Sequence, residues 1–372
     1  MHQALPSKRT WSEPLGLTPA AAALGIFVLS FATLAGAWYF QFVLHYQPCH
    51  LCLIQRIPYY IVIPLSFAIA IAARYDAPRR FVFGGLAVLA AAALVSAALG
   101  GRSEPVYVFL PPGYAENPKE RYPALYLLHG TPGRPLNFIQ VGDLGVLEDT
   151  LVAEHRIHPM VLVMPEGAFG LFGDTEWANS VRPGNDWESW VTEDVVTAVD
   201  GRFRVATSAD ARGIAGLSEG GYGALNIGIH HLDEFHLIES WSGYMGADNI
   251  KAIFGGEPSL LRYNSPAITV KAVAPVMRKD GDFIWFYCGS RDGSILGQNY
   301  RFASELAMLG VPHEFSVPGG SHSWKLWRSM AGEALQVAST HLTASNPTTG
   351  RAARHSHAGK RAAKGARARR LS

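Results

Sequence analysis

The stretch that decides the fold of most of this chain is Gly213-Ile214-Ala215-Gly216-Leu217-Ser218-Glu219-Gly220-Gly221-Tyr222-Gly223-Ala224. An unbroken apolar run leads into Ser218, and small residues dominate the segment that follows. This composition is typical of a buried strand that ends in a sharp turn and continues as a helix, because the turn is strained and the helix packs closely on the sheet. The pentapeptide G-x-S-x-G alone is a weak signal. Its strand–turn–helix context predicts an exposed nucleophilic serine.

Apolar runs of strand length alternate with longer amphipathic stretches on both sides of this segment. The predicted strands are 106–110, 124–128, 160–164, 213–217, 283–288 and 313–317. The predicted helices are 186–200, 219–231, 298–309 and 326–341. Unbroken apolar strands separated by helices predict an α/β domain whose mostly parallel sheet is covered on both faces. We assign this domain to residues 103–343.

A serine hydroxyl needs a base, and folds with this elbow place the acid and then the histidine after the serine. His322 lies in a Gly/Ser-rich loop after the 313–317 strand, so it is the predicted base. Asp292 follows the 283–288 strand in a loop and is the predicted acid, although an Asp-Gly pair is also a common turn. Glu305, on the following helix, is the alternative acid.

Two backbone N–H groups are needed to stabilise an oxyanion. One is predicted to come from Glu219, directly after the nucleophile. The other is predicted to come from Thr131 in the loop after the 124–128 strand, since Pro132 has no N–H to donate.

Four motifs in this order resemble one family of esterases. They are Tyr122–Gly130, Trp187–Asp194, Gly216–Leu225 and His322–Trp327. They are similar to the esterase D and S-formylglutathione hydrolase group, and the last also resembles the ending of the mycobacterial mycolyltransferases. The resemblance implies an α/β-hydrolase fold and ester hydrolysis or acyl transfer through an acyl-enzyme on Ser218, with no cofactor and no metal. The mycolyltransferases use a glutamate on a helix as the acid, which keeps Glu305 open.

The first hundred residues have a different composition. Three apolar stretches, at about 20–44, 53–73 and 81–100, are each close to the length that crosses a bilayer as a helix. We therefore predict a cytoplasmic N-terminus over 1–19 and a three-helix membrane segment over 20–101. Lys8 and Arg9 precede the first helix, and Arg74, Arg79 and Arg80 lie between the second and third, which places those two segments in the cytoplasm and the hydrolase domain outside. The expected location is the bacterial cytoplasmic membrane.

A C-x-x-C motif lies at the predicted outer end of the second membrane helix. Cys49 and Cys52 in this motif, followed four residues later by Arg56, resemble the first redox motif of the disulfide-bond formation protein B family, DsbB. The resemblance implies thiol–disulfide exchange, with a quinone cofactor beside Arg56. That family has a fourth membrane helix and a second outer cysteine pair, and both are replaced here by the hydrolase domain. A structural disulfide, a partial relay and a membrane anchor therefore remain alternatives.

The charge distribution restricts the partners. Residues 102–350 hold eighteen Lys and Arg against twenty-eight Asp and Glu, a formal net charge of −10, which argues against nucleic acid. The expected partners are an ester or acyl-lipid substrate and membrane lipids. Residues 344–372 form a basic tail predicted to be disordered, either solvated or in contact with anionic envelope components.

Three functional hypotheses follow from the sequence. The first is a membrane-anchored serine esterase or acyltransferase. The second is a thiol oxidoreductase that uses Cys49 and Cys52, with the hydrolase domain accessory. The third is a hydrolase domain that has lost catalysis and serves in binding.

Overall fold

The computed structural model describes residues 92–168, 175–248 and 250–343, together with Leu24, Phe27, Val28 and 31–35 near the N-terminus. The chain divides into two compact units, Met1–Leu89 and Ala90–Ser372, which we describe separately.

The described positions of the first unit are all helical, and the rings of Phe27 and Phe31 stack with centroids 6.1 Å apart. No helix among the described residues is both long enough and apolar enough to cross a membrane. The predicted span at 53–73, the Cys49–Cys52 motif with Arg56, the 1–19 segment and the basic tail at 344–372 lie outside the described residues, as does most of 20–44.

The prediction of a membrane helix over 81–100 is wrong for its final part. Residues Ala92–Val95 form a strand, β1, which pairs antiparallel with β2 (Ser103–Phe109), with Ala92 opposite Val106. The chain turns back at Gly100 and Gly101, whose φ angles of 66° and 85° suit glycine. A short apolar run does not distinguish a strand from a helix by itself, and the neighbouring β2 provides the hydrogen-bonding partner. The second unit therefore includes residues that the sequence assigned to the membrane segment.

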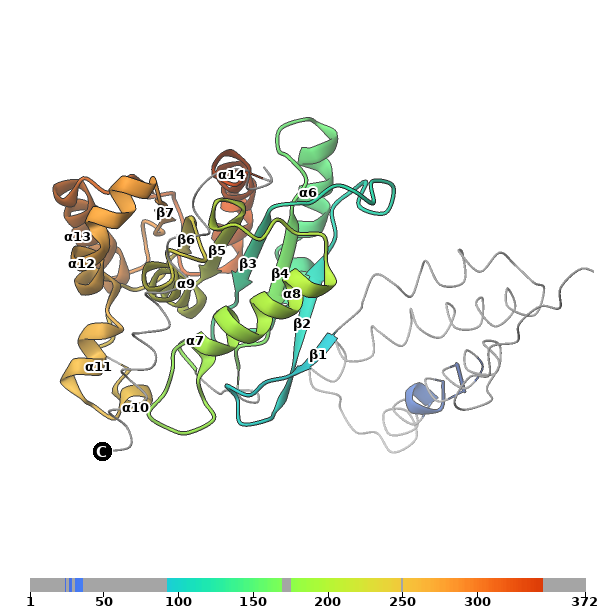
Figure 1. The fold of residues 1–372 in the computed structure, drawn as a ribbon, viewed down its shortest axis with the longest axis horizontal. Coiled ribbons are helices and arrows are strands. Elements are labelled where there is room, and N and C mark those ends of the chain that lie inside the picture. The colour runs from blue at the N-terminus through green and yellow to red at the C-terminus, as the bar shows by residue number, and fades with distance from the viewer. Residues whose placement is uncertain are drawn as a thin grey trace, which may run out of the picture. The chain divides into compact units, whose positions relative to one another are not determined.

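The second unit is built on an eight-stranded, mostly parallel sheet (Figure 1). The strand order is β1, β2, β4 (Val161–Pro165), β3 (Ala124–Leu128), β5 (Arg212–Leu217), β6 (Leu237–Trp241), β7 (Phe283–Tyr287) and β8 (His313–Ser316). β2 is antiparallel to both of its neighbours, β1 and β4, and every other neighbouring pair in this sheet is parallel. The expectation of an α/β domain with a mostly parallel sheet is confirmed.

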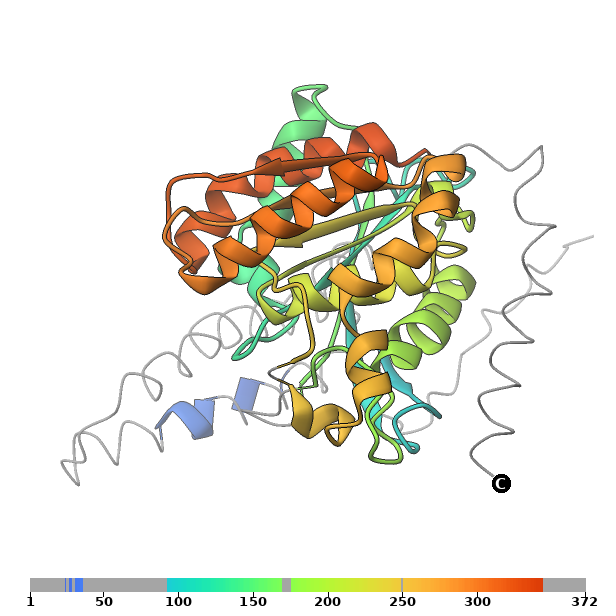
Figure 2. The same cartoon turned by 90° about the vertical axis from the view of Figure 1, so that its left-hand side faces the viewer.

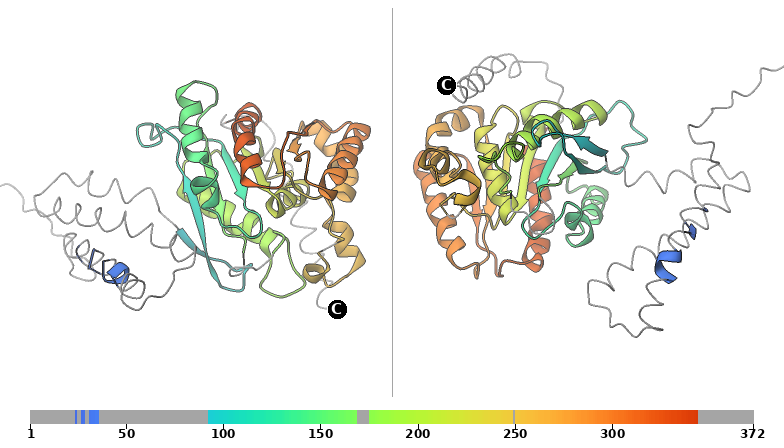
Figure 3. Two further views of the ribbon diagram at one scale, coloured as in Figure 1. Left: turned by 180° about the vertical axis from the view of Figure 1, so that it is seen from behind. Right: turned by 90° about the horizontal axis from the view of Figure 1, so that it is seen from below.

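Helices cover both faces of the sheet (Figures 2 and 3). One face carries α5 (Asn137–Gln140), α6 (Leu144–Ala153) and α14 (Trp324–His341). The other carries α7 (Trp187–Ser189), the π-helical stretch Trp190–Val195, α8 (Val196–Arg202), α9 (Glu219–His230), α12 (Pro266–Asp280) and α13 (Ser294–Leu309). Two short helices, α10 (Lys251–Phe254) and α11 (Pro258–Tyr263), pack in a small separate cluster. Each sheet face thus has its own apolar core layer, as expected for buried parallel strands.

The sequence prediction missed β6, although this strand is central and fully buried. The reason is Glu239, a carboxyl group inside the strand that interrupts the apolar pattern. The Trp241 indole N–H donates to its Oε2 at 3.1 Å, and burial raises the pKa of Glu239 to about 8. A neutral, hydrogen-bonded carboxyl is compatible with a core position that an ionised one would disrupt.

Candidate active site

Ser218 stands at the turn between β5 and α9. Its φ and ψ of 57° and −120° are rare for a residue with a side chain, and its N–H donates to the Trp241 carbonyl oxygen at 2.9 Å. A methyl group on Gly220 would lie 1.9 Å from the Leu128 carbonyl oxygen, so only glycine fits where α9 meets β3. The small residues of the elbow are therefore required by close packing.

The structure brings His322 and Asp292 to this serine. His322 Nε2 lies 2.7 Å from Ser218 Oγ, and His322 Nδ1 lies 3.5 Å from Asp292 Oδ2. The Asp292 side chain is fully buried, and its Oδ2 also accepts the Gly289 N–H at 3.1 Å. The edge of the Trp327 ring packs against the imidazole at 5.1 Å between centroids. Ser218, His322 and Asp292 thus follow one another in the order that a nucleophile, its base and a supporting acid would need, with hydrogen-bond reach between the first two.

The alternative acid occupies a different position. Glu305 lies on α13 and lines the cavity described below, and its carboxylate pairs with Lys271 on α12 at 3.3 Å. The structure therefore places Asp292, and not Glu305, against the imidazole.

The two residues predicted to form the oxyanion hole lie beside the nucleophile. Thr131 and Glu219 line the same cavity wall as Ser218. The loop that carries Thr131, His129–Gly133, is called the oxyanion loop below after its predicted role. It passes close to the serine, because a methyl group on Gly130 would lie 2.8 Å from Ser218 Cβ. The Thr131 hydroxyl donates to the Glu219 carboxylate.

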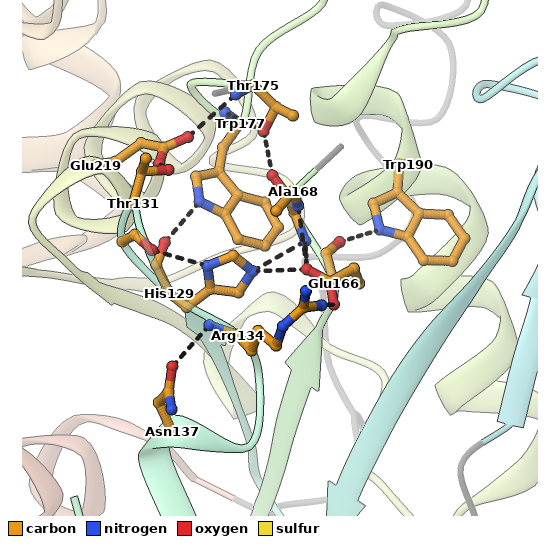
Figure 4. A network of polar contacts seen from close by, with 12 residues as sticks. His129, Thr131, Arg134, Asn137, Glu166, Ala168, Thr175, Trp177, Trp190 and Glu219 are labelled. Carbon is orange, nitrogen blue, oxygen red and sulfur yellow. Dashed lines mark hydrogen bonds and ion pairs between the residues drawn. The ribbon is translucent and has the colours of Figure 1, made fainter. Parts of the chain in front are cut away.

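A buried polar network supports this loop (Figure 4). His129 Nε2 lies 3.1 Å from Glu166 Oε1, and the backbone N–H groups of Gly167 and Ala168 donate to the same oxygen, each at 3.2 Å. Burial acts to raise the pKa of Glu166, but these hydrogen bonds outweigh it and lower the pKa. The Trp177 indole N–H donates to the His129 carbonyl oxygen at 2.9 Å. The one indication of this network in the sequence is Glu166, a charged residue just after the predicted buried strand 160–164.

The nucleophile opens onto a cavity of about 730 Å³. Its walls come from the oxyanion loop, from residues 244–250 and 265–268, and from α13. Tyr244 donates to the Glu176 carboxylate, while Gln298 and Arg301 project from α13. Among the residues that the structure describes, no cluster of three or more acidic, histidine or cysteine side chains could hold a metal ion. The cavity has the size of a small-molecule site with both polar and apolar walls.

Residues 96–335 match the sequence model of the family described as putative esterase, which accounts for well over half of the chain. The chain belongs to this esterase family. Residues 19–104 match a second family, disulfide bond formation protein DsbB. The predicted fusion of an esterase with a DsbB-like segment is thereby confirmed, and because DsbB proteins are membrane proteins the match supports membrane association.

Individual proteins agree with the esterase assignment. The chain is 27% identical over 247 residues to an esterase of Mycobacterium tuberculosis, covering 58% of this chain and 52% of that one. A solved ferulic acid esterase shares 26% identity with a TM-score of 0.60, covering 68% of this chain and 98% of that one. An S-formylglutathione hydrolase from Agrobacterium tumefaciens, at 17% identity and a TM-score of 0.57, has the same fold over 68% of this chain and 94% of its own. The present chain spans about half the length of the curated relatives it matches.

Proposed function

We propose that the protein is a membrane-anchored, extracytoplasmic serine esterase that works through an acyl-enzyme on Ser218. The observation that carries the proposal is the 2.7 Å approach of His322 Nε2 to Ser218 Oγ, at a strained elbow that opens onto a cavity. The esterase family match supports an ester as the substrate class.

The first half-reaction forms the acyl-enzyme. His322 Nε2 takes the proton of Ser218 as Oγ attacks the ester carbonyl carbon, and the carbonyl oxygen becomes an oxyanion. The backbone N–H groups of Glu219 and Thr131 stabilise that charge. Collapse of the tetrahedral intermediate breaks the bond to the alcohol, which leaves with the proton from His322.

The second half-reaction transfers the acyl group to water or to another hydroxyl. His322 now deprotonates this acceptor, which attacks the acyl carbon. Collapse of the second tetrahedral intermediate breaks the bond to Ser218 Oγ, and His322 returns the proton to that oxygen. Asp292 stabilises the imidazolium formed in each half and holds the imidazole with Nδ1 protonated. Hydrolysis and acyl transfer differ only in the acceptor, and an acyl-lipid of the envelope is a substrate consistent with a catalytic domain near the bilayer.

The proposed anchoring uses the N-terminal segment as three membrane helices with the esterase outside the bacterial cytoplasmic membrane. The DsbB match supports a membrane segment, and the lysine and arginine positions support the orientation. Because β1 belongs to the sheet, the third helix must end before Ala92. The basic tail would then lie outside, within reach of anionic lipid head groups or envelope polymers.

The test of the catalytic proposal is hydrolysis of a short-chain p-nitrophenyl ester together with labelling by a fluorophosphonate probe. Ser218→Ala should abolish both, whereas Ser259→Ala, which changes an exposed serine on α11, should retain both. Hydrolysis that persists in Ser218→Ala would refute the proposal. A native protein that binds esters but neither turns them over nor reacts with the probe would instead support a binding role.

The DsbB match favours a second activity in the N-terminal segment. In this proposal a Cys49–Cys52 disulfide would oxidise a thiol pair of a substrate protein and become reduced itself, and a quinone held near Arg56 would supply the oxidising power to re-form it. Expression in a strain that lacks disulfide-bond oxidation tests it, with Cys49→Ser as the control. Rescue by the native chain but not by the variant would support the activity, and failure to rescue would argue for an anchor or a structural disulfide.

A further inference from the structure

The side chain of Glu219 connects two segments that lie on either side of it. Its Oε2 accepts a hydrogen bond from the Thr131 hydroxyl, and its Oε1 accepts the backbone N–H groups of Thr175 at 3.3 Å and Glu176 at 2.8 Å. Figure 4 shows Glu219 beside Thr131 and hydrogen-bonded to Thr175. Only 4% of Glu219 is exposed, so these bonds form where water competes little.

A carboxylate suits this position on two grounds. All three partners are donors, and an ionised carboxylate is an acceptor with two oxygens. Glu219 is also the first residue of the twelve-residue helix α9, where the helix dipole favours a negative charge. An apolar side chain of similar length would remove the acceptor for the Thr175 and Glu176 N–H groups.

The segment on the far side of Glu219 is strained. Glu176 and Trp177 have φ angles of 52° and 51°, a region that residues with side chains seldom occupy. Such a conformation persists only when the surrounding structure holds it. Glu219 binds the segment at Thr175 and Glu176, and the Trp177 indole binds it to the His129 carbonyl oxygen.

The oxyanion loop is therefore attached to the strained segment at two points. His129 is held by Trp177, and Thr131 is held by Glu219, which itself binds Thr175 and Glu176. Gly130, between these two anchors, is the residue whose added methyl group would collide with the Ser218 side chain. The position of the loop over the nucleophile thus depends on contacts that the Glu219 side chain makes.

We infer that the side chain of Glu219 is a positioning residue that holds the oxyanion loop in its reactive geometry. This role is separate from that of its backbone N–H, and it rests on the proposed serine esterase function. Because the charge on the oxyanion develops in the transition state, loss of the Glu219 side-chain hydrogen bonds should lower kcat far more than it changes KM.

Three variants test the inference with a p-nitrophenyl ester. Glu219→Met, which keeps the side-chain length and removes the acceptor, should lower kcat by roughly 10- to 100-fold with KM changed by less than about threefold. Glu219→Gln, which keeps one oxygen acceptor, should recover most of that loss. Thr131→Val, which keeps the backbone N–H and removes the hydroxyl, should lower kcat, and adding Glu219→Met to it should cost less than Glu219→Met alone.

A second measurement separates positioning from general destabilisation. A boronic acid that adds to Ser218 places an oxygen in the oxyanion hole, so its affinity should fall in Glu219→Met in parallel with kcat. Glu314→Met, which changes an exposed residue on β8, is the matched control and should leave both values at the native level.

The outcomes are distinct from those of the proposed function. A Glu219→Met enzyme with kcat within about twofold of native, or independent effects of the Glu219 and Thr131 changes, would overturn the inference while the loss of activity in Ser218→Ala still stood. If Glu219→Met does not fold, Thr131→Val carries the test, and a native kcat in that variant would overturn the inference. Activity retained in Ser218→Ala would instead refute the serine mechanism itself.

Discussion

Cys288 Sγ lies 3.7 Å from Asp292 Oδ2, the same oxygen that faces His322 Nδ1. The thiol is buried at the end of β7, and the carboxylate follows in the next turn. A thiol is a weak hydrogen-bond donor, so this contact stabilises the Asp292 carboxylate much less than the hydrogen bond from the Gly289 N–H does. The contact matters more for Cys288, because ionisation of its thiol would place a thiolate next to a carboxylate in a buried environment.

Cys288 should therefore be inert in the folded protein. Burial, followed by repulsion from Asp292, raises the pKa of its thiol to about 12, so almost no thiolate is present at pH 8. Peptide mapping after iodoacetamide treatment at pH 8 should find Cys288 unmodified in the native protein and alkylated after unfolding in guanidinium. Rapid alkylation of native protein would contradict the burial of this residue.

Asp292→Asn should reduce kcat by roughly 10³- to 10⁴-fold while the protein stays folded. An amide cannot stabilise the imidazolium, and its N–H₂ group favours the imidazole tautomer with the proton on Nε2, the nitrogen that must receive the Ser218 proton. Glu305→Gln, by contrast, should lower kcat by less than about tenfold, because Glu305 pairs with Lys271. The measurement is ester hydrolysis across pH 5 to 9, and the reverse order of the two effects would identify Glu305 as the acid.

Glu188 should make stability depend on pH through its contacts with histidine. Burial acts to raise its pKa, but the approach of His230 Nδ1 at 3.6 Å and the hydrogen bond with His231 Nε2 at 2.8 Å outweigh this and lower the pKa to about 2. The pKa of His231 is raised, because its hydrogen bond to Glu188 outweighs the opposing effect of burial. The carboxylate contribution is lost as pH falls from about 4.5 towards about 2, and the histidine contribution is lost as pH rises above about 6.5.

Glu188→Gln should accordingly destabilise the esterase unit most between about pH 4.5 and 6.5, by roughly 3 kcal/mol. Thermal unfolding in detergent at pH 5.5 and pH 8.5 checks this, with the exposed Glu314→Gln as the control. A loss of stability that is equal at the two pH values would show that the ion pair with His231 contributes nothing specific.

The parts of the fold that the sequence predicted correctly share one property: the local pattern and the tertiary environment agree. β3 and β7 consist of aliphatic and aromatic residues, and β5 is apolar after Arg212, so the burial of these strands could be predicted from their composition. Ser218 and His322, which the structure brings to 2.7 Å, could be paired from the sequence because each lies in a glycine-rich segment beside a strand end. β1 could not be predicted as a strand, because its apolar residues belong to an apolar stretch of membrane-helix length. Only the pairing with β2 shows that these residues form a strand.

The polar network around the oxyanion loop could not be predicted from the sequence for another reason. Glu219 begins α9, whereas Glu166 and His129 follow the ends of β4 and β3, so their side chains meet only in the folded chain. Their roles depend on which donors the fold places next to them. The donors from Thr175 and Glu176 belong to a segment without any recognisable motif.

Glu239, the buried carboxyl group that interrupts the apolar pattern of β6, should make the stability of the protein depend on pH. Burial raises its pKa to about 8, so the folded protein holds it neutral at pH 7 whereas the unfolded chain ionises it. Its effect on stability is therefore unfavourable from about pH 4.5 upwards and grows until about pH 8. Glu239→Gln retains an oxygen for the Trp241 indole N–H and cannot ionise, so it should raise the melting temperature at pH 8 by several degrees and change it little at pH 4.5. Differential scanning calorimetry at pH 4.5 and pH 8 measures these melting temperatures, and Glu239→Leu is a comparison variant that also removes the acceptor. A lower melting temperature for Glu239→Gln at pH 8 would mean that the carboxyl group is ionised and stabilised in the folded protein.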